Sequence, residues 1–355
     1  MLRRVVSAST VGTALEWYDF TLYGTAAALV FGKVFFSSQD PLVGTLASFA
    51  TFAVGFVARP IGGVLFGSWG DRSGRKLMLV VTLSLMAASS TLIGLLPDYD
   101  TIGVAAPIVL VVLRVLQGLG SGAEFAGSTL MAAEHAPDHR RGLFAAIPAA
   151  GNAMGVILAS AVFTPFTLLP DEQFLSWGWR VPFLLSVVIV GVGLYIRLRV
   201  PERPAFESTR QAGATASLPL ATAVRTAPRR LGLAFLANIG PNVASYVPAV
   251  FALSYIANDL GLPESVGTVG LLIANLVKLV TLPLCGALSD RFGRRPVFIS
   301  GALLCAVLAF PFFWLLDTEH VLLIWLALTL VLTISNDMML GPQASMLAEQ
   351  FDTRT

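Results

Sequence analysis

The sequence contains few charged residues. Of its 355 residues, 12% are Asp, Glu, Lys or Arg, about half the share found in an ordinary soluble domain. In contrast, 55% are hydrophobic, and the mean hydropathy is +0.77. A helix that crosses a bilayer needs about 20 mostly apolar residues, and runs of that length recur along the chain with the charges gathered between them. The shortage of charge therefore excludes an ordinary soluble protein and predicts an all-α membrane protein.

Cysteine and histidine are also scarce. The two cysteines, Cys285 and Cys305, both lie within apolar runs, which argues against a disulfide framework, a metal site or a thiol catalyst. His135 and His139 lie in a polar stretch beside arginines and without a third ligand nearby, so we expect solvated loop residues. No H-E-x-x-H or G-x-S-x-G motif occurs in a membrane context. We therefore expect no metal, no cofactor and no enzymatic activity.

The apolar runs predict ten membrane spans in two bundles. We place them near 11–36, 42–66, 77–96, 104–133, 142–169, 179–198, 230–257, 266–289, 296–316 and 321–347. A longer polar stretch with several prolines and arginines separates the sixth span from the seventh. We therefore predict a six-helix N-terminal bundle over residues 1–198, a cytoplasmic linker over 199–229 and an incomplete C-terminal bundle of about four helices over 230–355.

Basic residues are unevenly distributed between the predicted loops. If the N-terminus is cytoplasmic, the cytoplasmic segments hold 18 of the 23 lysines and arginines, and the outer loops hold only Lys33 and Arg180. Cytoplasmic loops of membrane proteins carry such an excess, so we predict a multi-pass inner-membrane protein with its N-terminus in the cytoplasm. The net charge of +2 gives no indication of a nucleic-acid partner. The first apolar run contains Glu16 and Asp19 and no clear cleavage site, so we expect a retained span.

A ten-residue motif occurs twice at corresponding places. GSWGDRSGRK begins at Gly67 after the second span, and GALSDRFGRR begins at Gly286 after the eighth, an offset of 219 residues. A motif repeated in two halves predicts two similar bundles with a binding site near the midplane between them. The alternative is that each copy is an ordinary basic hairpin on the cytoplasmic side.

The motif residues predict a gate. Glycine permits positive φ and close approach, aspartate suits a helix N-terminus, and the basic residues face anionic lipid. Charged contacts of these loops would hold the cytoplasmic side closed in one conformation. The predicted gating residues are Gly67, Asp71, Arg72, Gly74, Arg75, Asp290, Arg291, Gly293 and Arg294.

Several further stretches accompany this motif. They are GTALEWYDFTLY at Gly12–Tyr23, ARPIGG at Ala58–Gly63, RVLQGLGSGAE at Arg114–Glu124, WGWRVPF at Trp177–Phe183, and LYIR at Leu194–Arg197. Together with the motif, they make the chain resemble the metabolite:proton symporter branch of the major facilitator superfamily, over its whole length. The resemblance implies a fold of two pseudo-symmetric bundles, and proton symport of a dicarboxylate, tricarboxylate, oxoacid, shikimate-like acid, or a zwitterion such as proline or betaine.

Four ionisable residues within the N-terminal spans are predicted to couple transport to protons: Glu16, Asp19, Arg114 and Glu124. Glu16 and Asp19 lie 12 and 15 residues past Arg4, about 18 and 22 Å along a helix and on one face of it. Carboxylates at that depth usually relay protons or neutralise a buried base. Arg114 could bind an anionic substrate or exchange partners with Asp19. The structural alternative is a fixed pair of Arg114 with Glu124 or with a carboxylate of the first span.

Other buried polar residues are candidates for substrate binding. Arg59 either faces the site or extends to the cytoplasmic surface. Lys278, near the middle of the eighth span, is expected to contact a substrate carboxylate. Tyr23, Asn242 and Asn336 complete the predicted binding set, although the proline beside Asn242 is equally well explained as a kink.

The chain has two spans fewer than the twelve of the resembling family. We therefore expect either a fragment or a shortened product that does not transport on its own. The alternative functions are a facilitative uniporter or a non-transporting sensor on the same scaffold. A channel is disfavoured because paired gating loops and buried charges suit a carrier. We expect a monomer whose partners are the bilayer, protons and a small-molecule substrate.

Overall fold

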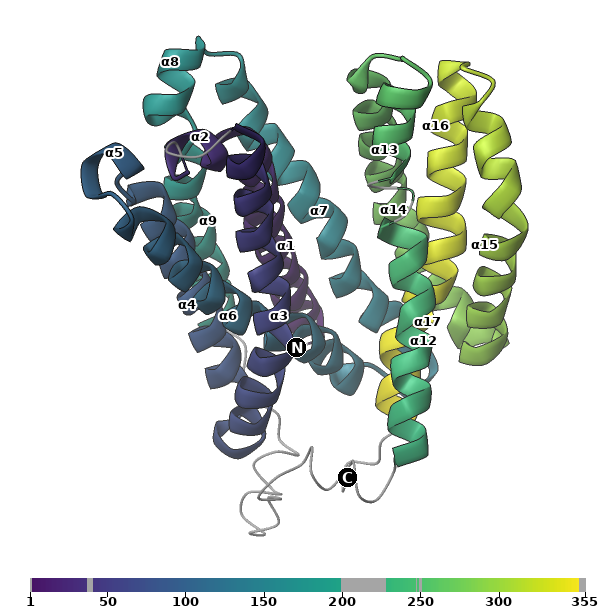
Figure 1. Ribbon diagram of the computed structural model, residues 1–355. Helices are drawn as coiled ribbons and strands as arrows, with labels where there is room; N and C mark the ends of the chain where they lie inside the picture. Colours follow the sequence, from purple (N-terminus) through teal and green to yellow (C-terminus); the bar gives the residue numbers. More distant parts are fainter. Residues whose placement is uncertain (1, 37–40, 199–227, 247, 249–250, 351–355) are drawn as a thin grey trace. The chain divides into compact units, whose positions relative to one another are not determined.

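A computed structural model describes residues 2–36, 41–198, 228–246, 248 and 251–350, which are almost entirely helical and contain no strand (Figure 1). The long helices follow the predicted spans, joined by short helical turns. In chain order the elements are α1 (Leu2–Ala26), η1 (Ala27–Phe31), α2 (Gly32–Val34), α3 (Pro41–Ser73), α4 (Arg75–Leu95), α5 (Tyr99–Ile102), α6 (Ala105–His135), η2 (Asp138–Arg140), α7 (Arg141–Thr167), α8 (Asp171–Gln173), η3 (Phe174–Gly178), α9 (Arg180–Leu198), α12 (Pro228–Tyr246), α13 (Ala252–Ser254), η5 (Tyr255–Asp259), α14 (Glu264–Phe292), α15 (Arg294–Leu316), α16 (Val321–Thr329), η6 (Leu330–Ser335) and α17 (Asn336–Gln350).

Eight of the described helical stretches are long and apolar enough to cross a membrane. The first and seventh predicted spans are not among these eight. Helix α1 carries Glu16 and Asp19 in its middle. Residues 247, 249 and 250 of the seventh span lie outside the described residues, and its described parts include α12, α13 and η5. The predicted linker, residues 199–229, lies outside the described residues except for its last two.

The chain forms two compact units. The N-terminal unit comprises Ser7–Ser128 and Met154–Leu218, and the C-terminal unit comprises Met1–Val6, Thr129–Ala153 and Pro219–Thr355. The core of the N-terminal unit is aromatic: Phe31 packs edge-to-face against Tyr23, Phe35 and Trp179. The core of the C-terminal unit is mainly aliphatic and is built from α13, η5, α14, α15, α16 and η6.

Glycines bring α3 and α6 into backbone contact. A Cβ atom on Gly62 would lie 2.0 Å from the carbonyl oxygen of Leu119, and one on Gly122 would lie 2.0 Å from the carbonyl oxygen of Arg59. Such approach requires residues without side chains. This close packing accounts for Gly122 in the Arg114–Glu124 stretch and fixes the rotation of the two helices that carry Arg59 and Arg114.

We expect Gly62→Ala to lower the midpoint of thermal unfolding in detergent by several degrees. The added methyl group must push two backbones apart, and overpacking of this kind costs about 1–3 kcal/mol. Gly191→Ala is the control, because a Cβ atom there meets nothing within 4 Å. Equal midpoints for the two variants would contradict the packing role.

The two motif loops have the same geometry. Gly74 separates α3 from α4 with a φ of 100°, and Gly293 separates α14 from α15 with a φ of 94°. Residues with a Cβ atom rarely adopt this conformation. The turn predicted from the repeated motif is therefore confirmed in both copies.

Candidate functional site

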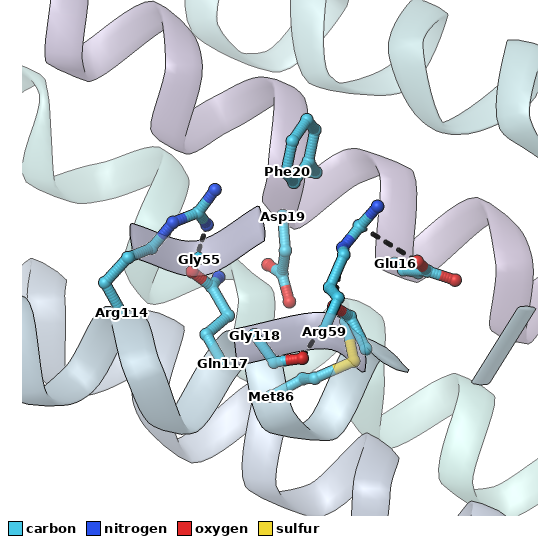
Figure 2. A pocket seen from close by; sticks show the side chains of 10 residues that line it. Glu16, Asp19, Phe20, Gly55, Arg59, Met86, Arg114, Gln117 and Gly118 are labelled. Carbon is cyan, nitrogen blue, oxygen red and sulfur yellow. Dashed lines mark hydrogen bonds and ion pairs between the residues drawn. The ribbon is translucent and has the colours of Figure 1, made fainter. Parts of the chain in front are cut away.

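Four charged side chains of the N-terminal unit line one pocket (Figure 2). Glu16 and Asp19 come from α1, Arg59 from α3 and Arg114 from α6. The space open to the centre of a water molecule is only about 10 Å³, which is about the room that one water needs. In this conformation the pocket can therefore hold a water or pass a proton, and it is too small for a metabolite. The remaining lining residues are Phe20, Gly55, Met86, Gln117, Gly118 and Ser121.

Arg59 forms an ion pair with Glu16. Its Nη2 lies 3.0 Å from Glu16 Oε1, and its Nε donates to Ser121 Oγ at 2.9 Å. The guanidinium also lies over the ring of Phe20, 4.4 Å from the centroid. Side-chain exposure is 20% for Arg59 and 2% for Glu16. Arg59 is thus held inside the unit by Glu16 and Ser121.

Arg114 is buried among aromatic rings. Its guanidinium carbon lies 4.0 Å from the centroid of Tyr23 and 5.0 Å from those of Phe20 and Phe52. Its Nη1 donates to Gln117 Oε1 at 2.6 Å. Cation–π contacts of a desolvated arginine contribute about 2 kcal/mol or more, so the rings help to stabilise the buried charge.

Among the described residues, the other edge of the Arg114 guanidinium has no hydrogen-bond partner. Neither Nε nor Nη2 is bonded within the described part of the chain. The alternative of a fixed pair between Arg114 and Glu124 is not found among the described residues: Glu124 instead accepts from Thr82 at 3.3 Å and Ser128 at 3.1 Å. Gly55 explains the room beside Arg114, since a Cβ atom on Gly55 would lie 2.4 Å from Arg114 Nε.

Asp19 is buried with one oxygen unsatisfied. Ser186 of α9 donates to its Oδ1 at 3.2 Å, whereas its Oδ2 has no hydrogen-bond partner among the described residues. No described lysine or arginine lies within ion-pair distance of Asp19, although Arg59 and Arg114 line the same pocket. A carboxyl group in this position can take up a proton without breaking an existing ion pair.

The remaining predicted substrate residues occupy separate places. The Tyr23 hydroxyl is hydrogen-bonded to Thr51 Oγ1 at 2.7 Å. In the C-terminal unit, Asn336 is fully buried and donates to Ser245 and to the Pro241 carbonyl oxygen. Asn242 is exposed and donates to the carbonyl oxygen of Asn238 on its own helix. The two asparagines therefore do not form a hydrogen bond with each other.

Lys278 forms the second buried ion pair. Its Nζ lies 3.6 Å from Asp337 Oδ1, and Thr281 donates to Asp337 Oδ2. The side chain of Lys278 is 10% exposed, and that of Asp337 is fully buried. Lys278, which was expected to contact a substrate carboxylate, thus has an acidic partner on α17.

The second motif copy binds the start of α7. Asp290 Oδ1 accepts from the backbone N–H of Gly142 at 2.8 Å, and its Oδ2 accepts from that of Leu143 at 2.9 Å. Arg294 forms ion pairs with Asp290 and with Glu349 of α17. A carboxylate at a helix N-terminus satisfies unpaired N–H groups and favours the helix dipole. In the first copy, the side chains of Asp71, Arg72 and Arg75 lie outside the described residues.

Sequence reasoning did not assign several uncharged residues of the site. Ser186 hydrogen-bonds to Asp19 across 167 residues, and Gln117 joins Arg114 to Ser90, its Nε2 donating to Ser90 Oγ at 2.7 Å. Phe20 and Phe52 flank the arginines. Small polar residues are common in membrane spans, and the only available signal was their occurrence in otherwise apolar runs.

The fold and the buried charges define a class: helical membrane proteins that carry solutes. The family model of the Major Facilitator Superfamily matches residues 9–355, and the chain belongs to this family of transporters. It is therefore a membrane transporter and is not classed with enzymes.

Relatives with known names agree with this assignment. The chain is 40% identical to the shikimate transporter of Escherichia coli K12 over 353 residues, covering 98% of this chain and 80% of that protein. It is 36% identical to the proline/betaine transporter of the same strain over 366 residues, covering 99% and 72%. The solved proton:xylose symporter XylE with bound 6-bromo-6-deoxy-D-glucose has a TM-score of 0.76 at 18% identity, covering 98% of this chain and 86% of that one. The last likeness shows the fold.

Proposed function

We propose that the protein is a proton-coupled symporter that takes up a small organic acid or zwitterionic metabolite across the plasma membrane by alternating access. It acts as a monomer with a cytoplasmic N-terminus. The excess of basic residues in the predicted cytoplasmic loops supports the orientation. Relatives named for shikimate and for proline and betaine support the substrate class.

The observation that supports the proposal most strongly is the buried environment of Asp19. It is 1% exposed, one of its oxygens lacks a hydrogen bond, and it shares a water-sized pocket with Arg59 and Arg114. A buried carboxylate without an ionic partner is costly, so a proton that removes its charge has a strong effect on the relative stability of conformations. Asp19 is the proposed coupling residue, with Glu16 and Glu124 in supporting positions.

The free edge of Arg114 is the proposed binding place for the substrate carboxylate in the N-terminal unit. Nε and Nη2 of a guanidinium match the two oxygens of a carboxylate, and both lack hydrogen bonds in the described residues. In the conformation described, the aromatic rings around Arg114 offset the missing partner. When the pocket opens, a substrate carboxylate would bind Nε and Nη2 of Arg114.

The repeated loops are the proposed cytoplasmic gate. The bonds of Asp290 to Gly142 and Leu143 join the second motif to the start of α7 within the C-terminal unit. Charged contacts of this kind close one side of a carrier and break when it opens. We propose the same role for Asp71, Arg72 and Arg75 in the first copy.

Uptake into proteoliposomes that contain the full-length protein tests the proposal. We expect shikimate, proline, glycine betaine or a dicarboxylate to accumulate only when the outside is more acidic, and an internal pH dye to report protons entering with the solute. Uptake that ignores the pH gradient would instead establish a facilitative uniporter. Binding without movement of any solute would favour a sensor.

A further inference from the structure

Two buried basic residues, Arg59 and Lys278, lie at the same distance before the two copies of the repeated motif. Arg59 lies eight residues before Gly67, the first glycine of the first motif copy, and Lys278 lies eight residues before Gly286 in the second. Each also lies on the helix that ends at its motif loop, α3 or α14. The two bases therefore occupy equivalent positions in the two halves of the chain.

Each of these bases is paired with a buried carboxylate of another helix in its own unit. Arg59 pairs with Glu16 of α1 at 3.0 Å, and Lys278 pairs with Asp337 of α17 at 3.6 Å. The first contact is a charge-assisted hydrogen bond. The second is longer than a hydrogen bond, so the two pairs are equivalent in position and unequal in strength.

Asp337 is poorly satisfied for a buried charge. Its Oδ1, the oxygen that faces Lys278, has no hydrogen-bond partner among the described residues, and its Oδ2 is bonded to Thr281. A fixed structural ion pair needs good geometry and satisfied hydrogen bonds to offset desolvation. The Lys278–Asp337 pair lacks both, which suits a pair that exchanges its partners.

Few other titratable groups lie near Asp337. Cys285, about two turns beyond Lys278 on α14, is close enough to interact with the Asp337 charge. The described arginines of α12 and α15, Arg229, Arg230, Arg294 and Arg295, all lie in the first turns of their helices. Arg294 contacts Glu349, about 18 Å along α17 from Asp337. Within the described residues, Lys278 is thus the cation that determines the charge balance at Asp337.

We propose that Lys278 and Asp337 form a second coupling site, in which a proton on Asp337 Oδ1 releases the Lys278 ammonium to bind the carboxylate of the substrate. The proton comes from the aqueous side that the carrier faces. Lys278 stays positively charged throughout, and the substrate carboxylate replaces Asp337 as its counter-ion. The net charge of the site is the same before and after binding. This inference rests on the proposed symport and assigns one proton to one substrate carboxylate in the C-terminal unit.

The charge balance also limits what the pair itself can bind. Once a proton neutralises Asp337, Lys278 is one positive charge without its counter-ion, and unpaired charge within a membrane is costly. The pair therefore takes one carboxylate of the substrate, whether the substrate is an acid or a zwitterion.

Exchange measurements at equal pH on both sides test this inference without any proton gradient. The probes are radiolabelled shikimate, proline and glycine betaine, and the readout is the concentration that gives half-maximal counterflow between pH 5.5 and pH 8. We expect wild type to weaken by fivefold or more as the pH rises, because Asp337 must be protonated for binding. Asp337→Asn mimics the protonated acid and is expected to bind tightly and independently of pH over this range.

Two further variants separate binding from folding. Lys278→Leu is expected to weaken binding at least tenfold at every pH. Because this change leaves Asp337 without its partner, Lys278→Leu with Asp337→Asn provides a version with no unpaired charge and the same expected loss of binding. Asp317→Asn, an exposed carboxylate of the same unit, is the control and should behave as wild type.

Two outcomes would overturn the inference in distinguishable ways. If wild type exchanges a probe and Asp337→Asn keeps the wild-type dependence on pH, or the double variant binds as wild type, the pair is structural and the proposed symport is unaffected. If wild type exchanges none of the probes under any condition, the proposed function fails and this inference fails with it.

Discussion

Replacing Arg114 by alanine is expected to reduce uptake by 100-fold or more while the protein remains folded. A carboxylate held by the two free nitrogens of the guanidinium would lose two charge-assisted hydrogen bonds, each contributing about 1.5–3 kcal/mol. Losses of that size correspond to factors of about 10² or more in affinity. The fold should survive, because Arg114 joins no carboxylate of the described chain and only Gln117 loses a bond. Uptake and thermal unfolding are measured on the same preparation.

Two related variants test geometry against charge at Arg114. Arg114→Lys keeps a positive charge without the planar fork and is expected to retain only a small part of the activity. Gly55→Ala keeps the arginine and adds a methyl group 2.4 Å from its Nε, so it should raise the half-saturating substrate concentration several-fold. If Arg114→Ala transported within about twofold of wild type, the arginine would have no place in substrate binding.

The Arg59–Glu16 pair is expected to show strong non-additivity. Arg59→Met leaves Glu16, which is 2% exposed, without its partner, and breaking a buried pair on one side costs about 3–5 kcal/mol. Arg59→Met combined with Glu16→Gln leaves no charge behind and should recover most of that loss. Thermal unfolding of the single and double variants in detergent measures the coupling. Destabilisation by the double variant equal to the sum of the single effects would show that the two side chains do not interact.

Part of the fold could be predicted from sequence because membrane spans depend on local composition. The ten predicted spans coincide with helical segments, and the repeated motif located both turns with positive-φ glycines, Gly74 and Gly293. Hydropathy does not register the change from α-helix to π-helix at Tyr255, within the seventh span.

The sequence predicted which residues belong to the candidate site. It did not predict which of them pair with one another. Charge within apolar runs identified Glu16, Asp19, Arg114 and Lys278, since each is costly to bury. Their partners depend on how helices are rotated and how closely they approach. The close contact of α3 with α6 through Gly62 and Gly122 sets the direction of Arg59, and no local pattern predicts that it pairs with Glu16 or that Ser186 hydrogen-bonds to Asp19.

The most direct test of the proposed symport compares wild type with Asp19→Asn in the same proteoliposomes. Asp100→Asn, an exposed carboxylate in α5, is the matched control. We expect Asp19→Asn to lose accumulation driven by a pH gradient, by 50-fold or more, and to keep exchange of substrate across the membrane at equal pH. Gradient-driven accumulation by Asp19→Asn at the level of wild type and Asp100→Asn would contradict coupling through Asp19.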